Sequence, residues 1–200
     1  GSNGALTGTA SQTINYDSNA TAVTAVPNTG YHFVNWTGTG GFVTITNNPL
    51  TVSNVTAAQT ITANYAINAY TVTFNSNGGS SVTSQSVAYN TTATSPTAPA
   101  KTGYTFAGWY SDSGLTTVFN FTTAITSDIT LYAKWTVNQY TVSFNSNGGS
   151  SVTNQSIPYN TTATSPTAPT KTGNTFAGWY SDSGLTTSFA FTTAITADTT

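Results

Sequence analysis

The stretch KTGYTFAGWY, residues 101–110, occurs in two further versions along the chain. Residues 171–180 read KTGNTFAGWY, and residues 28–36 read NTGYHFVNW. A Pro upstream of the Gly in each version is typical of a turn, and the residues after the Gly alternate as in a β-strand. The sequence therefore predicts at least three copies of one small β-module.

Aromatic residues recur at fixed offsets after the Gly of each version. An aromatic side chain buries more apolar area than any other type available in this chain. We therefore predict that these residues, together with the Trp of a later strand, anchor the cores of the modules. The predicted core anchors are Phe33, Trp36, Phe106, Trp109, Trp135, Phe176 and Trp179.

Charged residues are rare, at 4% of the chain, whereas about 25% is usual in soluble proteins. The three basic residues are all Lys, and the net charge is −2. Nucleic acid and anionic lipid attract clustered Lys and Arg, so we expect binding to neither. No run approaches the ~18 apolar residues of a membrane-spanning helix, and we expect no membrane insertion.

Thr, Ser, Asn and Gly take the place of charged residues, and the β-branched Thr favours strands over helices. Low charge with low hydrophobicity is also a mark of disorder. However, 12% of the residues are aromatic, and many of them recur at repeated positions. We therefore expect packed β-structure, without disulfides because the chain has no Cys.

Residues 71–130 align without gaps to residues 141–200, with 50 of 60 positions identical. In the first of these copies we expect strands at 71–74 and 84–90, with an Asn77-Gly78 turn after the first strand. Pro96 and Pro99 exclude a regular helix and favour an extended crossover. The Phe and Trp anchors then lie on a third strand.

The copy ends with a turn and a short strand within 111–121, followed by a last strand at 129–135. In the second copy, Pro158 lies in the second strand and predicts either an edge strand or a position that does not donate to a ladder, because proline has no N–H. A diverged copy precedes both. Its residues 11–23 match 84–96, and its residues 60–66 match 130–136. Between these segments, the loop at 36–49 has a different sequence. The predicted modules are residues 1–67, 68–137 and 138–200, called here the first, second and third repeats.

The combination of TVTFNSNGG, KTGYTFAGWY and ITLYAKWT resembles the Listeria-Bacteroides repeat, also called the internalin B-type repeat. The first repeat resembles the divergent variant of that family. The resemblance covers essentially the whole chain. It implies small β-grasp-like modules in tandem, in secreted or surface-anchored bacterial proteins, where they act as stalks, spacers or adhesive segments.

The two ends of the sequence predict incomplete repeats. Ser2 matches Ser76, so the first repeat begins after the place of its first strand, and Thr200 matches Thr130, so the third repeat stops before its final strand. In a β-grasp arrangement this leaves open sheet edges, which can pair with another chain. Two explanations stay open: a segment of a longer array, or strands supplied in trans by strand donation or filament assembly.

Candidate catalytic and metal-binding residues are few. His32 is the only histidine and is expected to be an ordinary strand residue, while Asp112 and Asp182 lie beside a Gly turn, where Asp side chains form turns. Paired catalytic carboxylates and an acid-rich Ca²⁺ loop are both missing from the sequence. We therefore expect no enzyme activity, no cofactor and no metal.

The sequence leaves two classes of function. The first is a structural surface repeat, acting as stalk, spacer or self-assembling fibre, whose partners are neighbouring repeats or other copies. The second is an adhesin or glycan-binding module that recognises a host or cell-wall glycan, or a surface protein, through exposed aromatic rings. The candidate rings are Tyr104, Tyr110 and Tyr180, because Tyr104 is replaced by Asn174 in the next copy and so is not required by the core.

Overall fold

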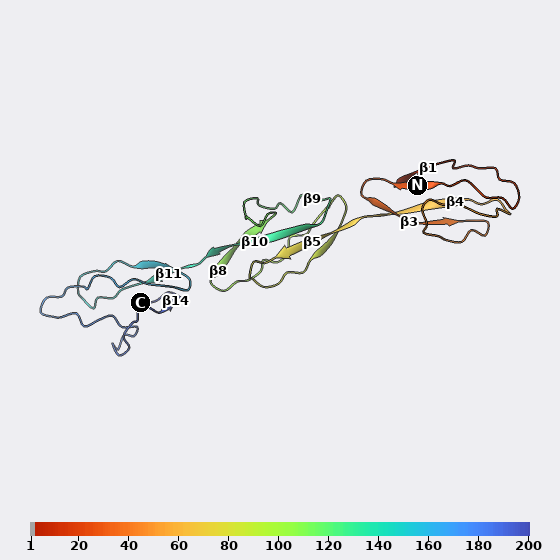
Figure 1. Cartoon of the computed structure of the whole chain (residues 1–200). Helices are drawn as coiled ribbons and strands as arrows, with labels where there is room; N and C mark the ends of the chain where they lie inside the picture. Colours follow the sequence, from red (N-terminus) through yellow and green to blue (C-terminus); the bar gives the residue numbers. More distant parts are fainter. Residues whose placement is uncertain (1–2) are drawn as a thin grey trace. The chain divides into compact units, whose positions relative to one another are not determined.

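The computed structural model describes residues 3–200, and every regular element in that range is a β-strand (Figure 1). The predicted mainly-β class is confirmed. No helix within residues 3–200 has the length and apolar character needed to cross a membrane. The predicted match of Ser2 to Ser76 lies outside the described residues.

The chain divides into two compact units whose boundaries do not follow the repeats. Unit 1 comprises Gly1–Thr73, Thr83–Ser95 and Phe119–Thr130. Unit 2 comprises Phe74–Val82, Pro96–Val118 and Leu131–Thr200. The first repeat thus belongs to unit 1 and the third to unit 2, while the second repeat contributes segments to both.

The first repeat holds two antiparallel pairs of strands. β1 (Gly4–Thr7) pairs with β2 (Thr24–Pro27), and β3 (Tyr31–Gly38) pairs with β4 (Ile61–Ile67) in a separate two-stranded sheet. A β-bulge between Phe33 and Asn35 shifts the register of β3. The buried centre of this repeat consists of Ala25, Trp36, Leu50 and Ala63.

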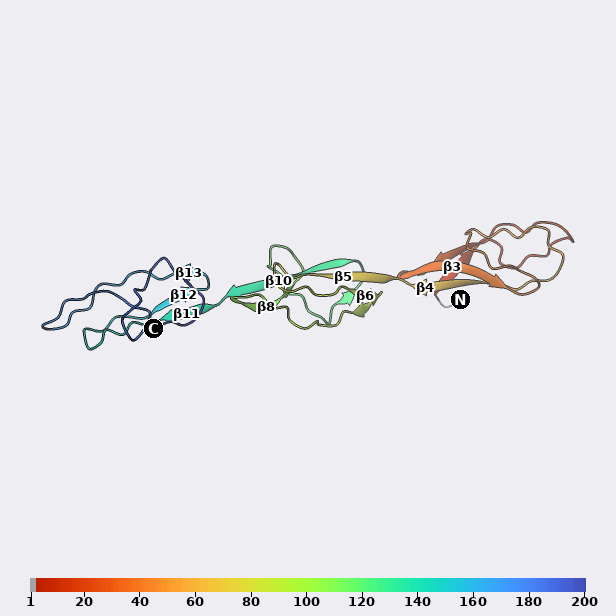
Figure 2. The same cartoon turned by 90° about the horizontal axis from the view of Figure 1, so that it is seen from below.

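The second repeat contains the largest sheet, with the order β6-β5-β10-β8 (Figure 2). Its strands are β5 (Ala69–Asn75), β6 (Gln85–Ala88), β8 (Tyr104–Tyr110) and β10 (Ile129–Val137). The short strands β7 (Thr91–Thr92) and β9 (Ala124–Ile125) form a pair of their own. β10 is therefore a central strand, and its Leu131 and Ala133 are fully buried.

The third repeat forms less regular structure from nearly the same sequence. β11 (Gln139–Val142) pairs with β12 (Gln155–Pro158), and β13 (Thr161–Thr162) pairs with β14 (Ala194–Ile195). Pro158 ends β12, whose one ladder is with β11, so its predicted edge position is confirmed. The core is Val142, Ile157, Ala163 and Ile195.

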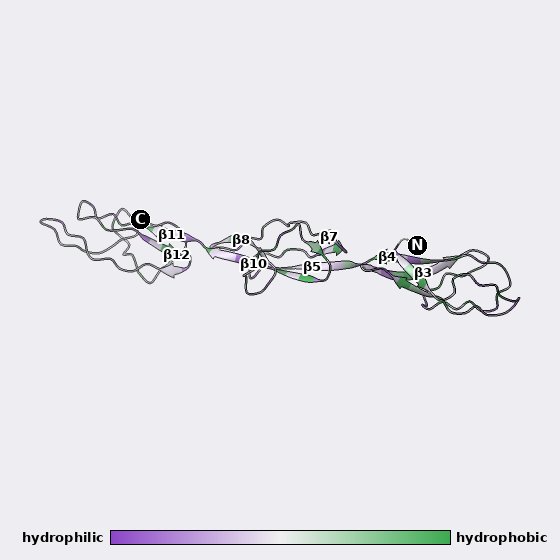
Figure 3. Ribbon diagram, turned by 90° about the horizontal axis from the view of Figure 1, so that it is seen from above, coloured by the Kyte–Doolittle hydropathy of each residue, from purple (hydrophilic) through white to green (hydrophobic). Residues whose placement is uncertain are grey.

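Two predicted strands differ from the structure. Residues 174–180 differ from β8 at one position, yet they form no strand. A strand needs a ladder partner; β10 provides it for β8, and within residues 3–200 no strand lies along 174–180. Residues 111–121 form turns and a single bridge between Tyr110 and Val118 rather than the expected short strand. Exposure alternates along β3 and β5, as in half-buried strands, and the strand ribbons carry both hydrophobic and hydrophilic residues (Figure 3).

Candidate functional site

The described part of the chain has few side chains that could act as catalysts or metal ligands. Among residues 3–200 no cluster of three or more His, Asp or Glu side chains is placed to hold a metal ion. The exposed His32 shares a hydrogen bond of 2.8 Å between its Nδ1 and Oδ1 of Asn68. The ring is thus part of a contact between two repeats.

Asp112 and Asp182 form turns, as the sequence predicted. The Asp112 carboxylate accepts hydrogen bonds from the backbone N–H of Thr117 at 2.7 Å and of Thr116 at 3.1 Å. Backbone donation from Thr117 and then Thr116 lowers the pKa of Asp112, and donation from Thr186 and Thr187 does the same for the pKa of Asp182. These carboxylates therefore support a loop and are poor proton donors near neutral pH.

The junction between the first and second repeats is a compact contact around Gly30. Gly30 has a positive φ of 82°, and a β-carbon at this position would overlap the ring of Tyr89. The N–H of Asn68 donates to the Gly30 carbonyl at 2.8 Å, and the N–H of Tyr89 donates to the Asn68 carbonyl at 2.8 Å. The linker residue Asn68 is thus hydrogen-bonded to both repeats.

The junction between the second and third repeats has the same geometry. A β-carbon on Gly103 would overlap the ring of Tyr159, and the N–H groups of Asn138 and Tyr159 make the corresponding hydrogen bonds, at 2.9 and 2.8 Å. The Thr105 hydroxyl donates to Oδ1 of Asn138 at 2.7 Å, in the place that His32 takes at the first junction. The ring of Tyr104 packs edge-on against Tyr159, with centroids 6.3 Å apart.

The residues equivalent to the junction Gly and Tyr, Gly173 in the third repeat and Tyr16 in the first, do not make this contact. Gly173 has nearly the same φ as Gly103, 72° against 77°, but within residues 3–200 no atom beyond its two chain neighbours lies within 4 Å of a β-carbon placed there. Tyr16 corresponds to Tyr89 and Tyr159 in the sequence, and it is 80% exposed. The Tyr–Gly contact is therefore present where two repeats meet and is not made at Gly173 or by Tyr16.

The central strand β10 of the second repeat is fixed by its Trp135. The indole Nε1 donates to the Ser76 carbonyl at 2.9 Å, and the ring packs against Phe106 at 5.6 Å. The Lys101 ammonium lies 5.8 Å from the same ring. Beside it, Gly79 leaves room for the indole, because a β-carbon there would stand 2.5 Å from Cζ2 of Trp135.

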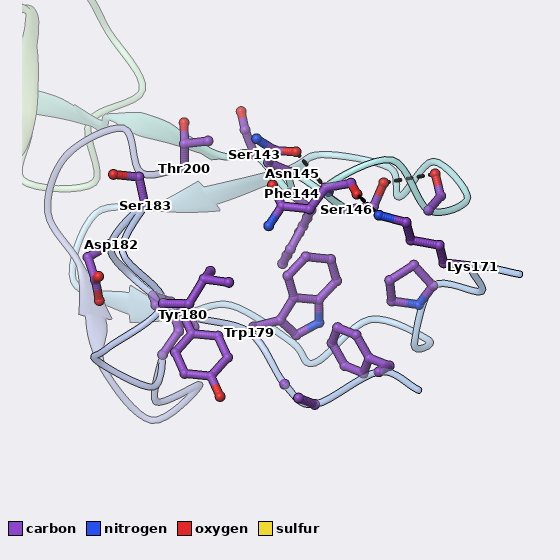
Figure 4. A pocket seen from close by; sticks show the side chains of 18 of the residues that line it. Ser143, Phe144, Asn145, Ser146, Lys171, Trp179, Tyr180, Asp182, Ser183 and Thr200 are labelled. Carbon is purple, nitrogen blue, oxygen red and sulfur yellow. Dashed lines mark hydrogen bonds between the residues drawn. The ribbon is translucent and has the colours of Figure 1, made fainter. Parts of the chain in front are cut away.

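The corresponding place in the third repeat is a cavity of about 520 Å³ (Figure 4). In Figure 4 the Trp179 ring lies at its centre, with Lys171 at one end and Tyr180 and Asp182 at the other. The residues that surround Trp135 in the second repeat have counterparts on its wall. These counterparts are Ser146, Gly149, Lys171 and Phe176.

The predicted core anchors occupy different environments. Trp36 and Trp109 are buried, while Phe33, Phe106 and Trp135 are half-buried and make tilted or edge-on contacts with neighbouring rings. Trp179 is also half-buried. Phe176 is 39% exposed, because it faces the cavity where the second repeat has Trp135.

The three tyrosines predicted to be exposed are not freely accessible rings. Tyr110 is buried, 8% exposed, although its pairing with Tyr132, next to that of Trp109 with Ala133, places the two rings on opposite faces of β8. Lys134 Nζ also lies over its ring at 4.8 Å. Tyr104 is half-buried against Tyr159, and Tyr180 is half-buried at the wall of the cavity.

Sequence reasoning missed the partner of each junction glycine. The signal was present, since a Tyr followed by Asn or Asp stands at the same place in all three repeats, at Tyr16, Tyr89 and Tyr159. This tyrosine lies in the repeat after the one whose Gly it covers. Comparison within one repeat therefore did not reveal the pairing.

The strand topology and the two Tyr–Gly junctions define a tandem β-repeat protein. Residues 70–134 and 140–200 match the Listeria-Bacteroides repeat domain, and residues 1–69 match the divergent InlB B-repeat domain. The chain belongs to the Listeria-Bacteroides repeat family, as the sequence predicted.

Similar proteins come from two bacteria. A protein of Evansella cellulosilytica named "Putative membrane protein" is 43% identical over 72% of this chain and 22% of its own length. A second protein of this bacterium, named "Putative Gly-rich membrane protein", is 41% identical over 82% of this chain and 19% of its own length. Internalin H of Listeria monocytogenes is 40% identical over 67% of this chain and 24% of its own length. The chain thus spans about a fifth to a quarter of these relatives. No solved structure matches it. The family and the relatives indicate a bacterial surface repeat protein.

Proposed function

We propose that the chain is a non-enzymatic spacer of the bacterial cell surface, in which three β-grasp-like modules, residues 1–67, 68–137 and 138–200, are held in series. The sheet order of the second repeat supports the module type, because its first and last long strands, β5 and β10, are central neighbours. The names of the relatives support a place at the bacterial cell surface.

The observation that carries the proposal is the recurring junction. At both junctions a tyrosine ring covers a glycine, and one Asn of the linker bonds to the repeats on either side. Such contacts restrain the rotation of one repeat against the next, whereas a bare flexible linker would not. A restrained series of small modules holds whatever lies at its end at a set distance, which is the task of a spacer.

The test measures the distance between two labels placed on either side of one junction. The chain has no Cys, so Thr97→Cys and Thr167→Cys introduce two unique labelling sites at equivalent exposed positions of the second and third repeats, both within unit 2. We expect pulsed electron paramagnetic resonance to give a narrow distance distribution, which Tyr159→Ala broadens.

Gly173→Ala provides the matched control, since this Gly makes no junction contact, and it should leave the distribution unchanged. A distribution that is broad in the unsubstituted chain and is unaffected by Tyr159→Ala would contradict the restrained spacer. It would instead favour flexibly linked modules.

Adhesion through aromatic rings is the second candidate. It is supported by Tyr180, which lies at the wall of a cavity with Trp179 and Asp182, a combination of aromatic and polar groups that suits sugars. The partner would be a host or cell-wall glycan. Addition of polysaccharide should then shift the fluorescence of Trp179, and Tyr180→Ala should abolish the shift; unchanged emission at saturating polysaccharide would exclude this role.

A further inference from the structure

We propose that the ring contact between Tyr104 and Tyr159 is an oxidative cross-linking site, at which a peroxide-derived one-electron oxidant joins the second repeat to the third through a dityrosine bond. The inference concerns a covalent modification, so it goes beyond the spacer role and does not depend on it. Both tyrosines belong to unit 2, and their rings are already in edge-on contact across the junction.

The amino-acid composition directs oxidation to aromatic side chains. Sulfur side chains are common targets of oxidants, which convert Cys to sulfenic acid and Met to sulfoxide. This chain has no Cys and no Met, but it has 11 Tyr and 4 Trp. A one-electron oxidant that reaches the chain therefore takes its electrons from phenol and indole rings.

The ring of Tyr159 contacts two other tyrosine rings. Its centroid lies 6.3 Å from that of Tyr104, which belongs to the second repeat, and 6.3 Å from that of Tyr140, which belongs to its own repeat. The Cδ1–Cε1 edge of the Tyr159 ring lies over Gly103, the residue before Tyr104. Cε1 is ortho to the phenol oxygen, and ortho carbons are those that couple when two tyrosyl radicals combine. The contact thus presents a reactive carbon of the third repeat to a tyrosine of the second.

The junction holds the two tyrosines together before any reaction. The N–H of Asn138 donates to the Gly103 carbonyl at 2.9 Å, and the N–H of Tyr159 donates to the Asn138 carbonyl at 2.8 Å. The backbone next to each ring is therefore fixed to the same linker residue. Coupling within one chain is then favoured over coupling between chains, because the two rings need not meet by diffusion.

The reaction balances with one molecule of hydrogen peroxide for each bond formed. Each phenol loses one electron and one proton, which leaves two neutral tyrosyl radicals. One ortho carbon of each ring forms the new C–C bond, and the hydrogen on that carbon moves to the oxygen, which restores both phenols. The two electrons and two protons reduce the peroxide to two molecules of water.

The surroundings of the rings allow the protons to leave. Tyr104 and Tyr159 are half-buried, and among the described residues neither phenol oxygen is buried without a hydrogen-bond partner. Each can therefore pass its proton to water or to a bonded acceptor. The Lys101 ammonium lies 4.7 Å from the centroid of the Tyr104 ring. Its charge would repel a cationic radical, but the neutral radical that forms on proton loss carries no charge to repel.

The first junction provides an internal comparison. Tyr31 and Tyr89 are the counterparts of Tyr104 and Tyr159. Tyr89 is in ring contact with Tyr70 of its own repeat, but within residues 3–200 no ring contact joins it to Tyr31. We therefore expect the cross-link between repeats to form at the second junction in higher yield than at the first.

The experiment treats the full chain with a peroxidase and hydrogen peroxide and then digests it with trypsin. The three basic residues are Lys101, Lys134 and Lys171, so Tyr104 lies in the peptide 102–134 and Tyr159 in the peptide 135–171. We expect mass spectrometry of the monomeric chain to show these two peptides joined, with the loss of two hydrogens. Fragmentation should place the bond between the two tyrosines.

Four controls make the test specific. Tyr104→Phe keeps a ring in place but removes the phenol, so it should lower the yield of joined peptides at least about tenfold. Tyr140→Phe removes the competing ring and should preserve or raise that yield. Gly103→Ala keeps every tyrosine but displaces the Tyr159 ring, so it should lower the yield. Oxidation in urea, where the junction is unfolded, should lower it as well.

Several outcomes would overturn the proposal. These are dityrosine that joins separate chains only, an equal yield of joined peptides in Tyr104→Phe, and an equal yield in urea. A bond between Tyr31 and Tyr89 that forms as readily as the one between Tyr104 and Tyr159 would show that ring contact does not select the site, and would overturn the proposal as well.

Discussion

The ring of Tyr159 occupies the space that a β-carbon on Gly103 would need. The two residues belong to different repeats, so this contact makes the geometry of a turn depend on the repeat that follows it. Gly103 and Gly173 lie in the same KTG sequence and have nearly the same φ. They differ in whether a tyrosine covers them, which allows the junction to be tested separately from backbone strain.

We therefore expect Gly103→Ala to destabilise the chain more than Gly173→Ala. Both substitutions carry the strain of a positive φ, about 1–2 kcal/mol. Gly103→Ala also displaces Tyr159, and overpacking of this kind costs about 1–3 kcal/mol more. Urea unfolding of the two variants measures the difference, and equal midpoints would show that Tyr159 contributes nothing to the junction.

Gly79, which lies beside Trp135, and its counterpart Gly149 in the third repeat provide a second matched pair of substitutions. A β-carbon on Gly79 would stand 2.5 Å from the Trp135 ring, whereas the nearest atom to one on Gly149 would be the Thr170 carbonyl oxygen, at 3.1 Å. We expect Gly79→Ala to destabilise the second repeat by about 1–3 kcal/mol and Gly149→Ala to have a smaller effect on the third. Hydrogen exchange in β10 and β11 reports each; a larger loss in Gly149→Ala would contradict the packing described for Trp135.

The two most buried indoles, those of Trp36 and Trp109, differ in whether their N–H group is hydrogen-bonded, so we expect the two N–H groups to have opposite effects on stability. Nε1 of Trp36 donates to the Asn47 carbonyl at 3.1 Å, while Nε1 of Trp109 is buried with no hydrogen-bond partner among the described residues. Trp36→Phe leaves an acceptor unpaired, whereas Trp109→Phe removes an unpaired donor. We expect Trp36→Phe to be more destabilising by about 1 kcal/mol.

The amides of Ala63 and Ala133 report the stability of the surroundings of these two indoles by hydrogen exchange. Both are core residues of the sheets that contain Trp36 and Trp109. A greater loss of protection at Ala133 in Trp109→Phe than at Ala63 in Trp36→Phe would refute the assignment.

The turn at Asp112 should weaken in acid. Backbone donation from Thr117 and Thr116 lowers the pKa of Asp112 below its ordinary value of 3.8, so the ionised form stabilises the fold. This stabilisation is complete above the unfolded-state pKa of about 3.9 and is lost as the pH falls through the lower folded-state pKa. NMR titration of the Thr117 amide should follow this loss below about pH 4.

Asp112→Asn should abolish that titration in the second repeat and leave the Thr187 amide, which donates to Asp182, titrating as before. Persistence of the same acid transition at Thr117 in the variant would mean that another group causes it.

The sequence predicted the β class and most strands of the second repeat, because turn residues and alternating patterns are local signals. It failed at residues 174–180, which have the sequence of β8 but not its structure. A strand is defined by its partner, and the partner of β8 lies about 25 residues further along the chain. No local pattern in 174–180 contains that information.

The candidate site was predicted less well, for a related reason. Tyr110 lies on the opposite face of β8 from Trp109, because the two residues pair in regular register with Tyr132 and Ala133 of β10. Its ring is nevertheless buried on that face, where Lys134 lies over it. The junction tyrosines were missed because each covers a glycine of the preceding repeat. Contacts between repeats require the register of the two repeats, which a single-repeat pattern does not give.

β10 has two nearly identical segments in its own chain with which it can pair, β8 and residues 174–180. The loop that joins it to β8 spans residues 111–128, and the loop to the second segment spans residues 138–173, twice as many. A doubling of loop length raises the entropy cost of closure by only about 0.6 kcal/mol. During refolding the two segments therefore compete for one strand, and the chain must reject a near-perfect wrong pairing each time it folds, a kinetic burden that grows with every further copy of the repeat.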